Sequence, residues 1–268
     1  MRIPFLNRAP RVSVVRLQGA IGISGRGGGG LNDAALAPVL ERAFTKGKPK
    51  AVALAINSPG GSPVQSSLIA ARIRRLADKH DIPVHAFVED VAASGGYWLA
   101  SAADKIWADE CSVVGSIGVI SAGFGLPDFI ARHGIERRVY TAGKSKSQLD
   151  MFRPENPEDI ARLKTLLKEM HRIFIDQVKT RRGSRLTGGD DTFSGEFWLA
   201  GRGLELGLID GIAHLAPKMR ALYGDNVRFQ AFSARQPFLR RFGLSAGALT
   251  DDALAAVEER AAFQRFGA

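Results

Sequence analysis

Cysteine is nearly absent from this sequence of 268 residues, and its single example is Cys111. One thiol excludes an intramolecular disulfide and a zinc site built from several cysteines. We expect Cys111 to be a small, buried apolar group, because unpaired cysteines behave as apolar side chains. The cysteine count leaves the redox state of the compartment open.

Long apolar runs are also absent. No stretch approaches the ~20 apolar residues that a membrane-spanning helix needs. Residues 1–10 carry charges but lack the apolar core of a secretory signal. We therefore expect a protein that is soluble or peripheral to a membrane, in a compartment that the sequence does not reveal.

Negative charge is outweighed by positive charge, with 37 lysines and arginines, 27 acidic residues and a net charge of +10. The basic residues are scattered and match no nucleic-acid-binding module, so we expect no nucleic-acid partner. Solvated surface is the first explanation, and weak attraction to an anionic membrane surface is the second. The glycine-rich run at 25–30 lacks the Lys-Ser/Thr pair of a phosphate-binding loop, so we interpret it as a flexible lid or connector.

Strand-like and helix-like segments alternate along the chain, which predicts an α/β fold with mostly parallel strands. Long helices are expected from Asn32 to about Phe44, from Pro63 to about His80, and from Pro157 to Arg182. The expected strands are residues 12–17, 51–56, 84–88, 105–108, 117–120 and 135–141.

The sequence is organised around Ser94, which lies between the strand-like run at 84–88 and a helix-like run at 97–103. Gly95 and Gly96 follow it, and glycines tolerate unusual backbone angles and leave room for a substrate. The free N–H groups of a helix start suit an oxyanion. This pattern is typical of an exposed nucleophile, although a plain strand–turn–helix connection has the same sequence.

A second strand–Gly-Gly–helix unit precedes the first by about thirty residues. Gly60 and Gly61 follow the strand at 51–56 and can present bare backbone N–H groups. The next helix has strong start signals, because Ser62, Pro63 and Gln65 form a capping-box pattern. Adjacent strands could therefore supply a nucleophile and an oxyanion hole.

Together these motifs resemble the signal peptide peptidase A family of Ser/Lys proteases, which share the fold of the Clp protease subunit and crotonases. The matching segments keep the expected order over most of residues 11–215. They are Asn-Ser-Pro-Gly-Gly at 57–61, Ala-Ala-Ser-Gly-Gly-Tyr at 92–97, Val-Gly-Ser-Ile-Gly-Val at 114–119, Gly-Lys-Ser-Lys at 143–146 and Gly-Arg-Gly-Leu-Glu-Leu-Gly-Leu-Ile-Asp at 201–210. The resemblance implies a spiral of strand–turn–helix units, with a protease domain at 1–222 and an appendage of uncertain packing at 223–268.

The resemblance also implies the site residues. Ser94 would be the nucleophile, Lys146 its general base, and Ser116 the hydroxyl that orients the lysine amine. A lysine accepts a proton only when it is neutral, so burial or a nearby positive charge must lower its pKa. Backbone N–H groups of Gly61 and Gly95 would hold the oxyanion. Such a mechanism needs no metal or cofactor.

Parts of the sequence depart from the family pattern or leave a choice open. Ser145 and Ser147 stand where the family often has an aromatic and an acidic residue, and Lys144 is the alternative base. No histidine lies between Ser94 and His133, so a Clp-like Ser-His arrangement is not expected. We interpret Asp210 as a turn or capping residue.

The activity implied is that of a serine endopeptidase that cleaves remnant signal peptides or other apolar peptide segments through an acyl-enzyme. Short members of the family bring serine and lysine together across neighbouring protomers of a ring. We therefore expect a homo-oligomer with shared sites. Many members also carry an N-terminal membrane anchor, which this sequence does not show.

Two other functions are compatible with the same fold. A crotonase-type enzyme acting on acyl-CoA would need carboxylates near the second Gly-Gly turn, and Glu89 and Asp90 precede Ser94. A catalytically inactive scaffold for membrane proteins is the other alternative, although Ser94, Lys146 and both glycine pairs are intact.

Overall fold

A computed structural model describes residues 9–22, 31–143, 145–233, 257 and 260–267. These residues form two compact units. The smaller unit is Gly118–Phe174, and the larger unit contains the residues before and after it.

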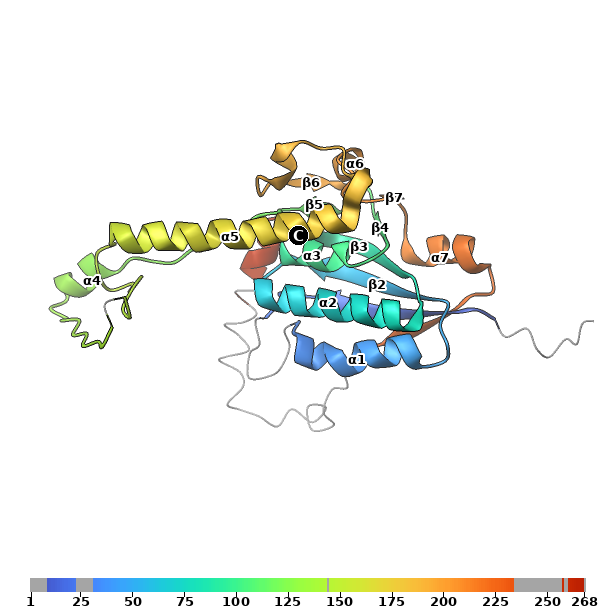
Figure 1. Cartoon of the computed structure of the whole chain (residues 1–268), viewed down its shortest axis with the longest axis horizontal. Coiled ribbons are helices and arrows are strands. Elements are labelled where there is room, and N and C mark those ends of the chain that lie inside the picture. Colours follow the sequence, from blue (N-terminus) through green and yellow to red (C-terminus); the bar gives the residue numbers. More distant parts are fainter. Residues whose placement is uncertain (1–8, 23–30, 144, 234–256, 258–259, 268) are drawn as a thin grey trace, which may run out of the picture. The chain divides into compact units, whose positions relative to one another are not determined.

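A sheet of eight strands forms the centre of the larger unit (Figure 1). The strands lie in the order β6-β5-β3-β2-β1-β8, with β4 pairing with β3 and β7 with β4. All pairs are parallel except the antiparallel pair of β5 and β6. The predicted α/β fold with mostly parallel strands is therefore confirmed. The strands are β1 (Arg11–Gln18), β2 (Ala51–Ser58), β3 (Val84–Ala93), β4 (Lys105–Ala108), β5 (Val113–Gly115), β6 (Phe197–Leu199), β7 (Gly211–Ile212) and β8 (Arg228–Phe232).

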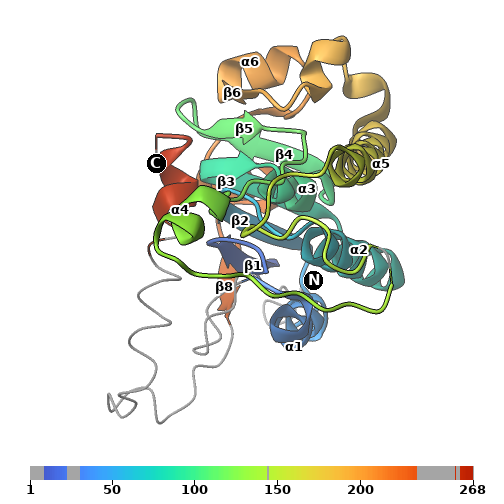
Figure 2. The ribbon, with the colours of Figure 1, turned by 90° about the vertical axis from the view of Figure 1, so that its left-hand side faces the viewer.

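Figure 2 shows α1 (Asp33–Thr45), α2 (Pro63–His80) and α3 (Gly95–Ser101) on one face of the sheet. The predicted caps of α1 and α2 are present, because the Asn32 and Ser62 side chains accept backbone N–H groups of their helices. The prediction of a capping box is wrong in one respect, because the Gln65 side chain does not accept the N–H of Ser62, which donates to Ile21 instead. The Gln65 amide oxygen accepts the N–H of Asp33 (2.8 Å), so it ties the start of α2 to the start of α1.

An apolar cluster lies where α7 (Leu215–Tyr223) meets the strands. Met219 of α7 is fully buried with Val12, Ala51, Ala53 and Phe87. Because strand side chains alternate between faces, these residues share one face of the sheet. The small alanines of β2 leave room there for the helix.

Two predicted strands are wrong, since residues 117–120 and 135–141 form none. The strand in this region is β5, and it ends where Ser116 takes a φ of 52°, which turns the chain out of the extended conformation. Residues 131–138 are exposed, so the second run has no core against which to bury an apolar face. Cys111 is also exposed, contrary to expectation, in the turn between β4 and β5.

The range 223–268 contributes a strand to the sheet. Strand β8 runs parallel to β1, with Val12 opposite Phe229 and Val15 opposite Phe232. Residues 234–256 lie outside the described residues, so the domain boundary at 222 stays a prediction. Among the described residues, no helix combines the length and apolarity that crossing a bilayer requires.

The remaining elements complete both units. The smaller unit contains α4 (Pro127–Arg132) and most of α5 (Pro157–Arg182), which ends in the larger unit. The larger unit also contains η1 (Gly183–Arg185), η2 (Asp190–Phe193) and α6 (Ala200–Glu205).

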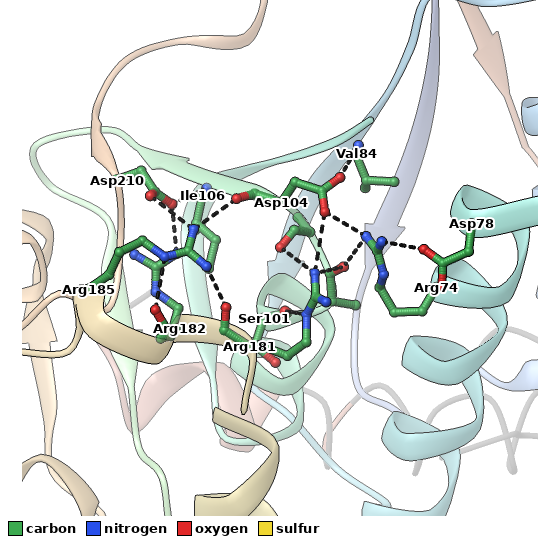
Figure 3. Close-up of polar contacts among 12 residues, drawn as sticks. Arg74, Asp78, Val84, Ser101, Asp104, Ile106, Arg181, Arg182, Arg185 and Asp210 are labelled. Carbon is green, nitrogen blue, oxygen red and sulfur yellow. Dashed lines mark hydrogen bonds and ion pairs between the residues drawn. The ribbon is translucent and has the colours of Figure 1, made fainter. Parts of the chain in front are cut away.

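An ion-pair cluster holds the end of α5 to the strands of the larger unit (Figure 3). Arg182 donates to Asp210 (2.7 Å) and to the Gly207 carbonyl (2.8 Å), and Asp210 also accepts the N–H of Ile106 (2.8 Å). Burial alone would raise the pKa of Asp210, but these donors and the charges of Arg182 and Lys105 outweigh it and lower the pKa. Asp210 thus acts as the junction of a buried polar network.

We expect Arg182→Met to lower the free energy of unfolding by about 3 kcal/mol, because it leaves a buried carboxylate without its main partner. The two side chains of this pair are 1% and 5% exposed. Urea denaturation measures the change. Arg202→Met is the matched control, since its pair with Glu205 is exposed and should contribute less than about 1 kcal/mol. Equal effects of the two substitutions would contradict the prediction.

Candidate active site

Three neighbouring strands, β2, β3 and β5, end at the same edge of the sheet. Ser58 in β2 pairs with Ala92 in β3, and Ala93 pairs with Gly115 in β5. Because these strands are parallel, the residues after their last pairs meet at their carboxyl ends. Three groups of predicted site residues follow those ends: Gly61, Ser94 with Gly95, and Ser116.

Ser94 forms the turn between β3 and α3 with φ 51° and ψ −122°. Residues other than glycine rarely adopt these backbone angles, and holding a residue in them costs roughly 1–3 kcal/mol. The Ser94 N–H donates to the Gly115 carbonyl (2.8 Å), and the Ser94 carbonyl accepts the Trp98 N–H (3.0 Å). Ser94 is partly exposed, whereas residues 91–93 and 95–103 are buried. The turn therefore presents one hydroxyl from an otherwise buried segment.

The loop after β2 touches the Ser94 turn through Gly60. A Cβ atom on Gly60 would lie 2.8 Å from the Cβ of Ser94 and 2.9 Å from the nitrogen of Gly95. A Cβ atom on Gly95 would lie 2.4 Å from the hydroxyl oxygen of Ser66. Only glycine at these two positions lets the loops approach so closely.

Two backbone donors belong to these touching loops. Gly61 bridges to Ile21 after β1, where the Ile21 N–H donates to Gly60 (2.8 Å) and the Ser62 N–H donates to Ile21 (2.8 Å). The N–H of Gly61 takes no part in that bridge. Gly95 is the first residue of α3, so its N–H has no acceptor within the helix. Among the described residues, neither of these two N–H groups donates a hydrogen bond to a protein acceptor.

Ser116 follows Gly115, the residue that pairs with Ala93 next to Ser94. Its N–H donates to the Glu196 carbonyl (2.6 Å), and its φ is 52°. A Cβ atom on Gly115 would lie 2.8 Å from the ring of Trp198, so a residue of β6 packs directly on this turn. Ser116 and Ser94 thus occupy equivalent places at the ends of adjacent strands.

Sequence reasoning missed the residues that support these loops. The buried Ser58 hydroxyl donates to the Gly19 carbonyl (2.7 Å) and accepts the Gly60 N–H (3.3 Å). The Tyr97 hydroxyl donates to the Leu208 carbonyl (2.7 Å), and burial raises its pKa. Ser58 and Tyr97 both belong to the quoted motifs, but nothing in their spacing indicates which carbonyl each would meet.

Lys146 lies in the smaller unit, apart in the chain from the strand ends of the larger unit. Its side chain is exposed, and its N–H donates to the Gly143 carbonyl (3.2 Å). The flanking serines are held within the same unit, since Arg162 donates to Ser145 (2.6 Å) and Arg153 donates to Ser147 (3.3 Å). Lys144, the alternative base, lies outside the described residues.

The same unit contains a cavity of about 860 Å³ next to the lysine loop. Ser145 and Ser147 line it, together with apolar side chains from three segments. Those apolar residues are Phe124, Leu149, Met151, Ile160 and Leu163. Charged residues line it as well, among them Asp150, Arg153, Glu158 and Arg162, so its lining is mixed.

The two carboxylates that precede Ser94 are engaged elsewhere. Glu89 pairs with Arg16 (3.0 Å), and Asp90 accepts a hydrogen bond from the Asn57 amide. These contacts link β1, β2 and β3 beside the candidate site. They give both acids a structural role.

The profile of peptidase family S49 matches residues 77–222, a range that includes Ser94, Ser116 and Lys146. A Brucella melitensis protein named Na(+)/H(+) antiporter NhaA is 47% identical over 96% of this chain and 37% of that protein. The chloroplastic serine protease SPPA of Arabidopsis thaliana is 32% identical over 63% of this chain and 25% of that protein. The chain thus spans well under half of either relative, and the antiporter name describes that protein alone.

Among solved structures, a mutant of the 1510-N membrane-bound stomatin-specific protease matches with a TM-score of 0.52. The match covers 85% of this chain and 100% of that chain at 16% identity. At this identity the likeness concerns the fold alone.

We expect Gly61→Ala to lower the free energy of unfolding by more than about 2 kcal/mol, because its Cβ would lie 2.1 Å from the Ile21 carbonyl oxygen. Its φ of 141° adds strain for any L side chain. Chemical denaturation measures the loss. Gly201→Ala in α6 is the control, since nothing lies within 4 Å of its added Cβ. A Gly61→Ala variant as stable as the control would show that the loops are not closely packed.

Proposed function

Because the chain belongs to peptidase family S49, as its motifs predicted, we propose that it is a serine endopeptidase with Ser94 as nucleophile and Lys146 as general base. The observation that carries the proposal is the Ser94 turn. A strained, partly exposed serine lies at the turn where two glycine loops touch.

In the proposed reaction, the Ser94 oxygen attacks a peptide carbonyl while the Lys146 amine takes the hydroxyl proton. The N–H groups of Gly61 and Gly95 donate to the resulting oxyanion, and each such donor typically contributes 10²–10³-fold in rate. The C–N bond then breaks, and Lys146 returns the proton to the leaving amine. A water molecule, deprotonated by the same amine, hydrolyses the ester on Ser94. No step uses a metal or cofactor.

Ser116 would orient the Lys146 amine by accepting a hydrogen bond from it. Its position supports this role, since it follows the strand pair that also places Ser94. It is partly exposed, as is Ser94. Both hydroxyls are therefore accessible at the same edge of the sheet.

We propose that a second copy of the chain covers the lysine loop and that the protein works as a homo-oligomer with shared sites. Burial is what lowers the pKa of a lysine enough for it to act as a base, and Lys146 is exposed. The smaller unit also exposes large apolar side chains, such as Phe124 at 81% and Tyr140 at 90%. Apolar surface of this kind marks association sites.

The proposed substrates are extended peptides with apolar or small side chains, such as remnant signal peptides. An extended chain can lie along the strand ends at Gly61, Ser94 and Ser116 in the manner of an added strand. The cavity beside Lys146 includes apolar side chains such as Met151 and Leu163, which such substrates could contact. The acyl-CoA alternative has less support, because Glu89 and Asp90 already have partners.

We expect Ser94→Ala and Lys146→Ala each to lower kcat for a fluorogenic signal-peptide-like substrate by about 10⁴-fold or more, because each removes a group that acts in the bond-breaking steps. Lys164→Ala is the matched control for the lysine, since it is exposed in the same unit. Circular dichroism verifies that the variants fold.

Survival of activity in Lys146→Ala alone would move the base to Lys144. Thioester hydrolysis that persists in Ser94→Ala would support the acyl-CoA enzyme. A folded, oligomeric wild type without peptidase activity would support the scaffold.

Mixing the two inactive variants tests whether sites are shared. If serine and lysine come from different protomers, a mixed oligomer of Ser94→Ala and Lys146→Ala contains some intact sites. Random assembly should restore roughly a quarter of the wild-type activity, as expected when a site needs two intact partners. No recovery after verified subunit exchange would place both groups of each site on one chain.

A further inference from the structure

The end of the sheet opposite the Ser94 turn is basic. The amino ends of β8, β1, β2 and β3 meet there, and six cations lie at these ends or in the segments that lead into them. We call these six residues the basic end: Arg11, Lys46, Lys48, Lys50, Lys79 and Arg228. Figure 1 shows the last turns of α1 and α2, which precede most of these residues, at this end of the larger unit.

Backbone pairing holds the basic end in place. Arg11 is opposite Arg228 in the pairing of β1 and β8, and the Lys50 N–H donates to the Arg11 carbonyl (2.8 Å). Lys48 has a φ of 52°, a conformation that non-glycine residues adopt only where the surrounding chain holds them. Pro49 between the lysines is buried. The turn therefore displays Lys46, Lys48 and Lys50 in a fixed arrangement.

The charge of the basic end is not neutralised. None of its six residues forms an ion pair within the part of the chain that the structure describes, and all except the partly exposed Arg11 are exposed. Two acidic residues near this end are already paired, Asp78 with Arg74 and Asp104 with Arg74 and Arg181. The other acidic residues of the same segments are Glu41, Asp81 and Asp225, which are exposed and half as numerous as the cations. A positive field therefore remains at this end.

We propose that the basic end docks on the anionic headgroups of a bilayer surface. Four adjacent strand ends span roughly 15 Å, from strand spacings of about 4.8 Å, so the exposed cations are spread out over a surface rather than gathered in a groove. Four of the six cations are lysines, which act as point charges rather than as the bidentate forks that read base edges. Leu222 near the end of α7 is 48% exposed and adds an apolar side chain for the interface.

Docking in this way would set the orientation of the proposed peptidase. Strand β3, which ends next to Ser94, has ten residues, so its two ends are separated by roughly 33 Å at about 3.3 Å per residue. The Ser94 turn would stand about that far from the headgroups. The site would then receive apolar peptides released from the bilayer rather than segments still within it, an inference that rests on the proposed function.

Co-sedimentation of the full chain with lipid vesicles tests the docking surface. We expect binding to mixed phosphatidylcholine and phosphatidylglycerol vesicles at low salt, and little binding to pure phosphatidylcholine. Replacing Lys46, Lys48 and Lys50 by glutamine should weaken binding roughly a hundredfold, at about fivefold for each charge near the surface. The control replaces Arg132, Lys164 and Lys168, three exposed cations of the smaller unit, by glutamine.

Equal weakening by the two triple variants would overturn the proposal, because net charge alone would then explain binding. Equal binding to neutral vesicles would also overturn it. Tighter binding to duplex DNA than to anionic vesicles at the same salt would assign the basic end to nucleic acid instead. Hydrolysis of a soluble peptide should be unchanged in the lysine variant, so failure of the docking surface and failure of the peptidase are distinguishable.

Discussion

The close approach of two glycine loops is the constraint on which the candidate site depends. Gly60 lies against Ser94 and Gly95, and a Cβ on Gly96 would lie 2.3 Å from the Ser58 carbonyl oxygen. The register of β2 and β3 shifts between Ile56 and Ser58, which lets the two strand ends meet at this height. The strained Ser94 backbone persists because the surrounding structure leaves it no alternative.

Support for the Ser94 turn extends to the far side of α3. Tyr97 is three residues from Ser94, and its buried hydroxyl binds the carbonyl of Leu208. Arg182 holds the adjacent Gly207 carbonyl, and Asp210 fixes the same segment to β4 through Ile106. A buried polar network of this kind is rigid when every member is satisfied. The position of the helix that begins at Gly95 therefore depends on the end of α5.

Much of the larger unit could be predicted from the sequence, because its strands and helices have clear periods and caps. The positions of Ser94, Gly61 and Gly95 follow from strand–turn–helix patterns whose strands prove to be neighbours. Partners over long range could not be predicted, such as the carbonyl that the Tyr97 hydroxyl reaches. The prediction of strands at 117–120 and 135–141 was wrong, because a strand also needs a neighbouring strand and a core to pack against, and apolar composition does not reveal either.

The position of Lys146 bears on how its amine could come to act as a base. Ser94, Gly61 and Gly95 belong to the larger unit, whereas Lys146 is exposed in the smaller one. If a second chain supplies the missing cover, association itself would create the base. The isolated chain would then hold a positioned but inactive nucleophile, and peptide cleavage would be confined to the assembled protein.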